Sequence, residues 1–135
     1  IVSSGKDWEI TSARVEHVQP YLDSLAYRVD YSEGSIVFSG DTKPCKALVD
    51  LSVNADVLVM ECIRLESEMK GNATSLSETS ALQAGKMAEE ANVKLLVLTH
   101  QAHYLDSVKD DVLKEVKMNY KGKLIWADEL MTVNF

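Results

Sequence analysis

The sequence predicts a layered α/β fold, and three observations support this prediction. Two apolar runs, DVLVM (56–60) and KLLVLT (94–99), have the near-continuous hydrophobicity of strands that are buried on both faces. Between these runs, alanines recur at helical spacing. Nearer the N-terminus, the segment LAYRVDY (25–31) alternates with a period of two, which is typical of a strand. Strands that alternate with helices imply βαβ units.

The remaining elements follow from the same patterns. Glu33-Gly34 marks a turn between two strands that resemble a hairpin. Residues 63–76 are polar and irregular, which predicts a loop. The expected strands are residues 7–17, 25–31, 35–39, 56–60, 94–99, 123–126 and 131–135. The expected helices are residues 46–53, a small-residue helix that Asn92 ends, and residues 107–118.

Serine residues before the small-residue helix are candidate caps. Ser75 and Glu78 have the spacing of a capping box, so we expect Ser75 or Ser77 to cap this helix. The helix then presents a stripe of small side chains, which lets it lie close to a sheet: Ala81, Ala84, Ala88 and Ala91.

Composition limits the class of protein. A chain of 135 residues is long enough for a single domain, which we expect to span residues 1–135. The net charge of −7 argues against a broad nucleic-acid surface, because phosphate binding needs clustered lysine and arginine. Cys45 and Cys62 form no CxxC motif and are expected to be reduced, buried thiols of a cytoplasmic protein. No apolar run reaches the ~18 residues that a membrane span needs, so we expect no membrane partner.

Candidate ligands follow three of the expected strands. His17 closes the first strand, Asp41 follows SIVFSG, and His100 follows KLLVLT. Ligands in α/β proteins bind near the carboxyl ends of strands. Two imidazoles and a carboxylate would suit Zn²⁺, Fe or Mn²⁺. The alternative for each histidine is a surface or hydrogen-bonded imidazole.

Four ordered segments resemble the metallo-β-lactamase superfamily, in particular its arylsulfatase-like and tRNase Z-like branches. They are VEHVQPYLDSLAYRV (15–29), SIVFSGDT (35–42), ADVLVMEC (55–62) and VKLLVLTH (93–100). The resemblance covers nearly the whole chain. It implies the C-terminal half of an αββα sandwich, a mixed sheet with helices on one face.

The resemblance also implies roles for individual residues. His17 would ligate the first metal ion, Asp41 would bridge both ions, and His100 would ligate the second. The implied cofactor is Zn²⁺, two ions per complete domain, with Mn²⁺ or Fe as substitutes. A metal-bound hydroxide would then be the nucleophile. Glu78 stands where related enzymes often carry a proton-handling histidine, so it is a candidate catalytic residue alongside Asp41, and a helix cap is its alternative.

This chain departs from the family pattern because it contains no HxHxDH segment. The chain also begins at Ile1 without a methionine. We therefore expect the complementary half to lie on another polypeptide, to have been cleaved away, or to be lost.

Other side chains near the expected site allow more than one interpretation. Glu61 could orient a metal ligand, or it could be a capping or exposed carboxylate. Asp128 could be a hydrogen-bond acceptor near the site or a turn residue. His103 is expected to face solvent, Tyr27 to belong to the core, and Tyr21 and Tyr104 to be candidates for a substrate cleft.

Two functions remain open. The first is a metal-dependent hydrolase acting on an ester, lactone, sulfate ester or phosphate ester, with RNA a less favoured substrate because of the acidic charge and Glu78. The second is a non-catalytic remnant or interaction subunit. Half a sandwich exposes an apolar sheet face, which predicts a complementary chain or a homodimer in either case. A flavodoxin-like module is disfavoured, since no glycine-rich phosphate loop follows a strand.

Overall fold

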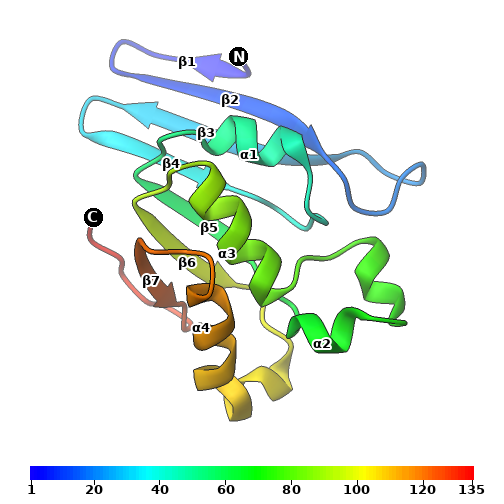
Figure 1. The fold of residues 1–135 in the computed structure, drawn as a ribbon. Coiled ribbons are helices and arrows are strands. Elements are labelled where there is room, and N and C mark those ends of the chain that lie inside the picture. The colour runs from blue at the N-terminus through cyan, green and yellow to red at the C-terminus, as the bar shows by residue number, and fades with distance from the viewer.

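A single seven-stranded mixed sheet organises the molecule in the computed structural model, which describes all residues 1–135. The strands lie side by side in chain order, from β1 at one edge to β7 at the other (Figure 1). β1 to β4 pair antiparallel, whereas β4 to β7 pair parallel. The strands are β1 Ser3–Ser4, β2 Trp8–Val15, β3 Ser24–Tyr31, β4 Gly34–Phe38, β5 Val57–Glu61, β6 Leu95–Thr99 and β7 Lys123–Trp126.

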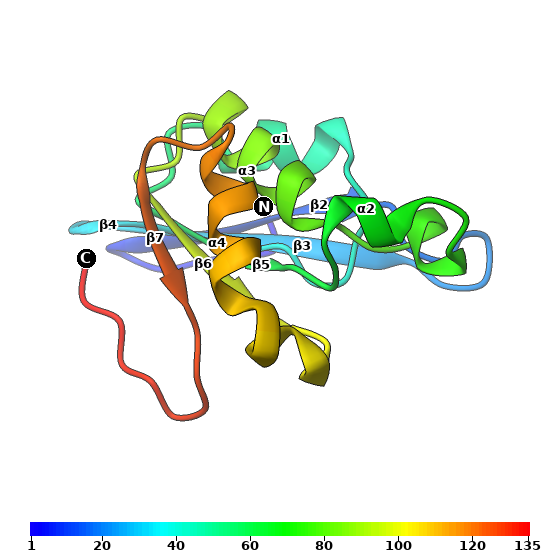
Figure 2. The ribbon, with the colours of Figure 1, turned by 60° about the horizontal axis from the view of Figure 1, so that its bottom comes forward.

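Helices cover one face of this sheet, as the sequence predicted. Figure 2 shows α1, α3 and α4 on the same side of the strands. None of the helices has both the length and the apolarity to cross a bilayer. The helical elements are α1 Lys46–Ser52, α2 Glu66–Met69, η1 Ala73–Leu76, α3 Ala81–Glu90, η2 His103–Val108 and α4 Lys109–Lys117.

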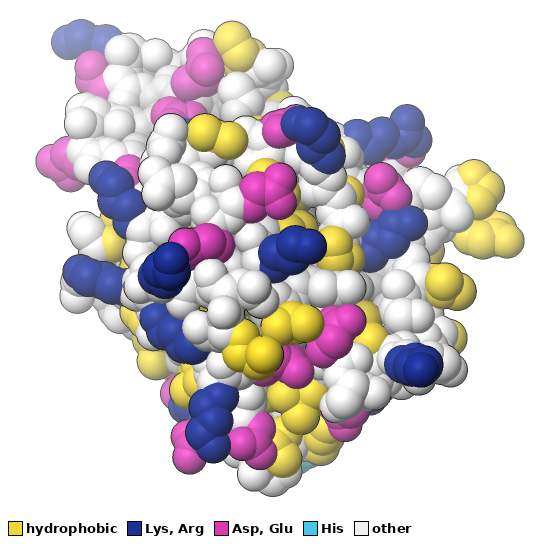
Figure 3. Space-filling model, viewed as in Figure 1, with side chains coloured by type: hydrophobic (Ala, Val, Ile, Leu, Met, Phe, Trp, Pro, Cys, Tyr) yellow, Lys and Arg dark blue, Asp and Glu magenta, His cyan; other side chains and the backbone are white.

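The main core lies between the sheet and these helices. Leu58, Leu96 and Leu98 point from the central strands into a cluster of 23 buried residues. The small side chains of Ala84 and Ala88 let α3 approach the sheet closely, as the alanine stripe predicted. On the outer surface of this helical layer, acidic and basic side chains are interspersed (Figure 3).

The opposite face of the sheet carries a continuous apolar row without a covering layer of helices. The cross-strand registers place Tyr27 beside Phe38, Phe38 beside Val59, Val59 beside Val97 and Val97 beside Ile125. Tyr27 is 39% exposed and Phe38 is 44% exposed. Tyr27 therefore lies on the open face, and its assignment to the core was wrong. We call this row, together with the flanking Val57 and Leu95, the open face.

The start of α3 differs from the prediction. Ser80 caps the helix, and its capping box is completed by Gln83. Ser75 lies inside η1 and Ser77 directly follows it, so neither caps α3. The motifs S-x-x-E at 75–78 and S-x-x-Q at 80–83 have the same local spacing, and only the docking of the helix on the sheet selects the second.

Two other assignments also differ. The predicted loop at 63–76 contains the short helices α2 and η1. The predicted strand at 131–135 is not a strand, because its backbone has no neighbouring strand with which to pair. The helix expected at 107–118 begins as the 3₁₀ turn η2 and continues as α4.

Gly85 gives a test of the contact between α3 and α4. A Cβ atom at Gly85 would lie 2.3 Å from the carbonyl oxygen of Val116. Gly85→Ala should therefore destabilise the chain by about 1–3 kcal/mol through overpacking, although alanine ordinarily stabilises a helix interior by roughly 0.5–1 kcal/mol. Urea unfolding measures the difference, with the exposed neighbour substitution Lys86→Ala as control. A Gly85→Ala variant as stable as the parent would show that the helices are farther apart.

Candidate functional site

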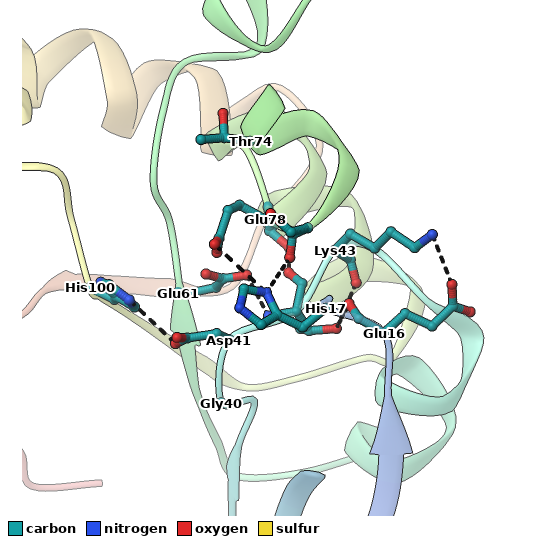
Figure 4. Close-up of polar contacts among 12 residues, drawn as sticks. Glu16, His17, Gly40, Asp41, Lys43, Glu61, Thr74, Glu78 and His100 are labelled. Atoms are coloured by element: carbon teal, nitrogen blue, oxygen red, sulfur yellow. Dashed lines mark hydrogen bonds and ion pairs between the residues drawn. The ribbon is translucent and has the colours of Figure 1, made fainter. Parts of the chain in front are cut away.

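Strand direction brings His17, Asp41 and His100 to one edge of the sheet. β2 is antiparallel to β3, which is antiparallel to β4, so β2 runs in the same direction as β4. β5 and β6 continue this direction in the parallel half. The carboxyl ends of β2, β4 and β6 therefore share an edge, and the candidate ligands follow these ends. Figure 4 shows their side chains gathered there.

Asp41 and His100 face one another at this edge. The Oδ1 atom of Asp41 lies 3.4 Å from Nε2 of His100, and the two side chains are 48% and 52% exposed. They help to line a cavity of about 230 Å³. Its other walls come from Phe38, Ser39, Gly40, Val59, Glu61 and Thr99. Both side chains are therefore accessible to a ligand and close enough to share one.

The backbone that carries these residues has two left-handed positions. Gly40 has a φ of 60°, and a Cβ atom there would lie 3.0 Å from the carbonyl oxygen of Leu25. Glycine is needed at this turn both for its conformation and for this close approach. His100 itself has a φ of 56°. Left-handed non-glycine residues are uncommon and cluster at functional sites.

His17 is held in a definite orientation. Its Nδ1 atom lies 2.8 Å from the carbonyl oxygen of Ser77, and the Oε1 atom of Glu78 lies 3.7 Å from the same nitrogen. A carbonyl can only accept, so Nδ1 carries the proton, and in the neutral ring Nε2 carries the free lone pair. A metal-binding histidine typically has this arrangement, in which the other ring nitrogen donates to an oxygen.

Glu61 is the buried centre of the site. Its side chain is 1% exposed, and its Oε1 atom accepts a 2.7 Å hydrogen bond from the backbone N–H of Thr42. The Thr42 hydroxyl donates toward the carbonyl oxygen of Glu16, and Thr79 donates to the carbonyl oxygen of Thr42. These contacts fix the Gly40-Asp41-Thr42 turn against β5 and the end of β2. Glu61 is thus neither a capping nor an exposed carboxylate.

Glu61 and Glu78 form a close carboxyl pair. Burial and the neighbouring Glu78 and Asp41 carboxylates raise the pKa of Glu61 well above its ordinary value, and the Thr42 N–H only partly opposes this shift. The Oε2 atoms of both glutamates are buried without a hydrogen-bond partner. One proton shared between the two carboxyl groups would satisfy both oxygens. The role of helix cap proposed for Glu78 was wrong, because Ser80 caps α3.

The other candidates lie apart from this cluster. His103 is exposed, as predicted, and Asp128 is an exposed residue of the segment after β7. The Tyr104 hydroxyl donates a hydrogen bond to Glu68 and accepts one from Arg64. Tyr21 is exposed on the loop that follows His17. The sequence did not predict the Glu61–Glu78 pair, although an acidic residue that ends a fully buried strand was a usable signal for Glu61.

The donor atoms suit a metal ion in type but not in number. Imidazole nitrogen and carboxylate oxygen are suitable ligands for Zn²⁺, Mn²⁺ and Fe. However, no three His, Cys, Asp or Glu side chains lie close enough together to hold a metal ion. Among the candidate ligands, Asp41 and His100 are adjacent, and the His17 ring is held in a definite orientation.

Comparison with known proteins identifies relatives of this fold. No protein-family model matches the chain. Ribonuclease Z of Archaeoglobus fulgidus is 32% identical over 98 residues, which cover 73% of this chain and 31% of the relative. The metallo-β-lactamase fold protein YhfI of Bacillus subtilis superposes with a TM-score of 0.78 at 28% identity, over 93% of this chain and 49% of YhfI. Human tRNase Z, short form, superposes with a TM-score of 0.72 at 18% identity, over 98% of this chain and 45% of that protein.

By these similarities, the chain is related to ribonuclease Z and to metallo-hydrolases. Within that class it belongs to the metallo-β-lactamase superfamily and is ribonuclease Z-like. The resemblance and the fold class predicted from the sequence are both confirmed. The chain spans about 31% of the length of the curated Archaeoglobus relative and about half of the YhfI structure.

The raised pKa of Glu61 gives a pH-dependent prediction. A carboxyl group whose pKa is raised in the folded state stabilises the fold fully below its unfolded value, near 4.5, and this contribution is lost as pH rises toward the folded pKa. Glu61→Gln keeps the Thr42 contact and needs no proton. Relative to the parent, this variant should gain up to about 1.4 kcal/mol of stability per pH unit above pH 5.

Urea unfolding between pH 4.5 and pH 8.5, with a chelator present, measures this difference. Glu90→Gln, at an exposed position of α3, is the matched control and should show no such trend. A constant gap between Glu61→Gln and the parent at all pH values would rule out a buried neutral Glu61.

The left-handed backbone at His100 gives a second prediction. His100→Gly should be more stable than His100→Ala by about 1 kcal/mol, because a Cβ atom is unfavourable in this conformation. The same pair of substitutions at Gln101, which is not left-handed, should show no such advantage for glycine. Thermal unfolding of the four variants checks this, and equal stability of the two His100 variants would contradict it.

Proposed function

We propose that this chain supplies part of the metal site of a metal-dependent hydrolase, with His17, Asp41 and His100 as ligands. The observation that carries the proposal is the 3.4 Å approach of Asp41 to His100 at the edge of the sheet, in a cavity open to solvent. The orientation of the His17 ring by the Ser77 carbonyl adds support, because it leaves Nε2 free.

Zn²⁺ is the metal we propose, because imidazole nitrogen and carboxylate oxygen are its usual ligands in catalytic sites. Bound there, the metal would polarise the substrate and lower the pKa of a coordinated water. Asp41 would bridge two ions and offset their mutual repulsion. His17 and His100 would each add a neutral ligand, which leaves the ions strongly Lewis-acidic.

Glu78 is the proposed proton-handling residue. Its Oε1 atom lies beside His17, and its Oε2 atom is buried without a partner next to Glu61. A proton held between Glu78 and Glu61 would be available to a leaving group at this edge. Glu61 itself acts through the Thr42 backbone, since it fixes the turn that places Asp41.

A phosphate ester is the substrate class that the relatives favour. Matched relatives that are 31–40% identical are named ribonuclease Z or ribonuclease BN. The net charge of −7 and the glutamate at position 78 favour a small phosphate ester over a long RNA, since polyanions are repelled by an acidic surface. Esters, lactones and sulfate esters are alternatives of the same reaction class.

A complementary segment carrying an HxHxDH motif is required by this proposal. No three potential ligands converge in this chain alone, and the sequence contains no HxHxDH. The open face offers the apolar surface on which such a segment would pack, with Tyr27 and Phe38 exposed at its β3 and β4 end. The complete site would then form between the two halves.

The alternative function is that of a non-catalytic interaction subunit. The same two observations favour it: the incomplete ligand set and the uncovered apolar face. In this case the open face binds a partner, and the cluster around Glu61 only stabilises the fold. If a domain completed with an HxHxDH segment binds metal, the hydrolase is favoured. If it binds none, the interaction subunit is favoured.

A chimera tests the proposal. This chain would replace the matching segment of Bacillus subtilis YhfI, of which it covers 49%. The chimera should bind about two Zn²⁺ ions per chain, as binuclear sites do, and hydrolyse bis(p-nitrophenyl) phosphate. Asp41→Asn and His100→Ala should each lower the metal content of the chimera. Each should also lower the rate of hydrolysis by at least about 100-fold.

His103→Ala is the matched control, since this exposed histidine lies outside the cluster. Unmodified YhfI is assayed in parallel for metal content and activity. A folded chimera whose metal content is unchanged by Asp41→Asn and His100→Ala would refute the ligand assignment and favour the interaction subunit.

A further inference from the structure

Two buried threonines join the turn that carries Asp41 to the segment that carries Glu78. The hydroxyl of Thr79 donates a 2.6 Å hydrogen bond to the carbonyl oxygen of Thr42, and both residues are 0% exposed. Asp41 directly precedes Thr42 in the chain, and both belong to the turn after β4. Glu78 likewise directly precedes Thr79. The bond therefore lies one residue away from the proposed bridging ligand and one residue away from the proposed proton-handling residue, both drawn in Figure 4.

Each end of this bond is also tied to the end of β5. The backbone N–H of Thr42 donates to Glu61, and the carbonyl oxygen of Thr79 accepts a 3.0 Å bond from the backbone N–H of Ile63. No other hydrogen bond joins residues 40–42 directly to residues 77–80. The Thr79 hydroxyl is thus the direct link that sets how far the turn lies from the segment before α3.

We propose that Thr79 is a positioning residue, whose hydroxyl holds Glu78 at the distance from Asp41 that proton transfer to a leaving group requires. This inference rests on the proposed hydrolase function. Thr79 acts through its neighbour Glu78, because its own hydroxyl is bonded to Thr42 and its side chain is fully buried. A general acid must lie within hydrogen-bond reach of the leaving oxygen. A misplacement of about 1 Å can cost about 100-fold in rate.

The proton-transfer step determines which substrates depend on this placement. As the phosphorus–oxygen bond to the leaving alcohol breaks, its electron pair stays on the oxygen, and Glu78 passes its proton to that oxygen. Water supplies the hydroxyl group that replaces the alcohol and the proton that returns to Glu78. A basic leaving group depends on this proton, whereas a stable anion such as p-nitrophenolate departs without it. Misplacement of Glu78 should therefore slow the hydrolysis of esters with basic leaving groups selectively.

Removal of the Thr79 hydroxyl in the zinc-loaded YhfI chimera tests the proposal. Thr79→Val keeps the shape of the side chain and loses the donor, whereas Thr79→Ser keeps the donor. The two substrates are bis(p-nitrophenyl) phosphate and diphenyl phosphate, of which the second has the more basic leaving group. Thr79→Val should lower kcat for diphenyl phosphate by about 100-fold and leave kcat for bis(p-nitrophenyl) phosphate little changed. Zinc content and KM should stay at the parent values, because the turn keeps its bonds to Glu61 and Glu16.

Further variants separate positioning from stability. Thr79→Ser should have the parent rates with both substrates, and Thr79→Ala, which also lacks the donor, should show the same selective loss as Thr79→Val. Thr11→Val is the matched control, since it makes the same chemical change at a half-buried position of β2. Gly85→Ala, which crowds the contact between α3 and α4, controls for lost stability. Both controls should keep the parent rates at a temperature where they are folded.

Rates that fall equally with both substrates in Thr79→Val and Thr79→Ala would overturn the role of Thr79, because loss of fold or of metal slows both reactions alike. So would rates equal to those of the parent with both substrates. In either case an active, zinc-dependent parent chimera leaves the proposed function intact. A parent chimera without zinc-dependent activity would instead refute the proposed function, and the role of Thr79 with it.

Discussion

The hydrogen bond from the Thr42 N–H to the buried carboxyl group of Glu61 holds the candidate site together. It ties the turn after β4 to the end of β5, so that Asp41 is placed by a buried contact rather than by a free loop. The turn also needs the left-handed Gly40, which lies against the Leu25 carbonyl. Burial raises the pKa of Glu61 and so favours its protonated form, which can lie beside Glu78 without repulsion between two charges.

The two faces of the sheet differ in how completely they are covered. One face is closed by α1, α3 and α4, with small residues allowing the close approach of α3. The other face exposes aromatic side chains, and residues 131–135 beside it have no strand partner. At the edge formed by the carboxyl ends of the strands, no three candidate ligands converge. The further polypeptide segment proposed above would both cover the apolar face and complete the set of candidate ligands.

Much of the architecture was predictable because it depends on local patterns of apolar and polar residues. The buried runs at β5 and β6 and the alternation at β3 identify strands within one or two residues of their observed bounds. The family resemblance supplied the covering of one face and the importance of the Gly40-Asp41-Thr42 turn. The cap of α3 was not predictable, since two serine motifs compete at equal spacing and tertiary docking selects Ser80. Residues 131–135 were predicted to form a strand, but a strand also requires a neighbour, which the sequence pattern does not provide.

The sequence by itself determined the α/β class, the order of the strands along the chain and the positions of His17, Asp41 and His100 after strands, because each depends on short-range periodicity and on recognisable segments. Only the tertiary structure decided which side chains meet. The approach of Asp41 to His100, the bond from His17 to the Ser77 carbonyl and the pairing of Glu61 with Glu78 join residues far apart in the chain. These contacts depend on strand direction, register and burial across the whole sheet, which no local pattern encodes.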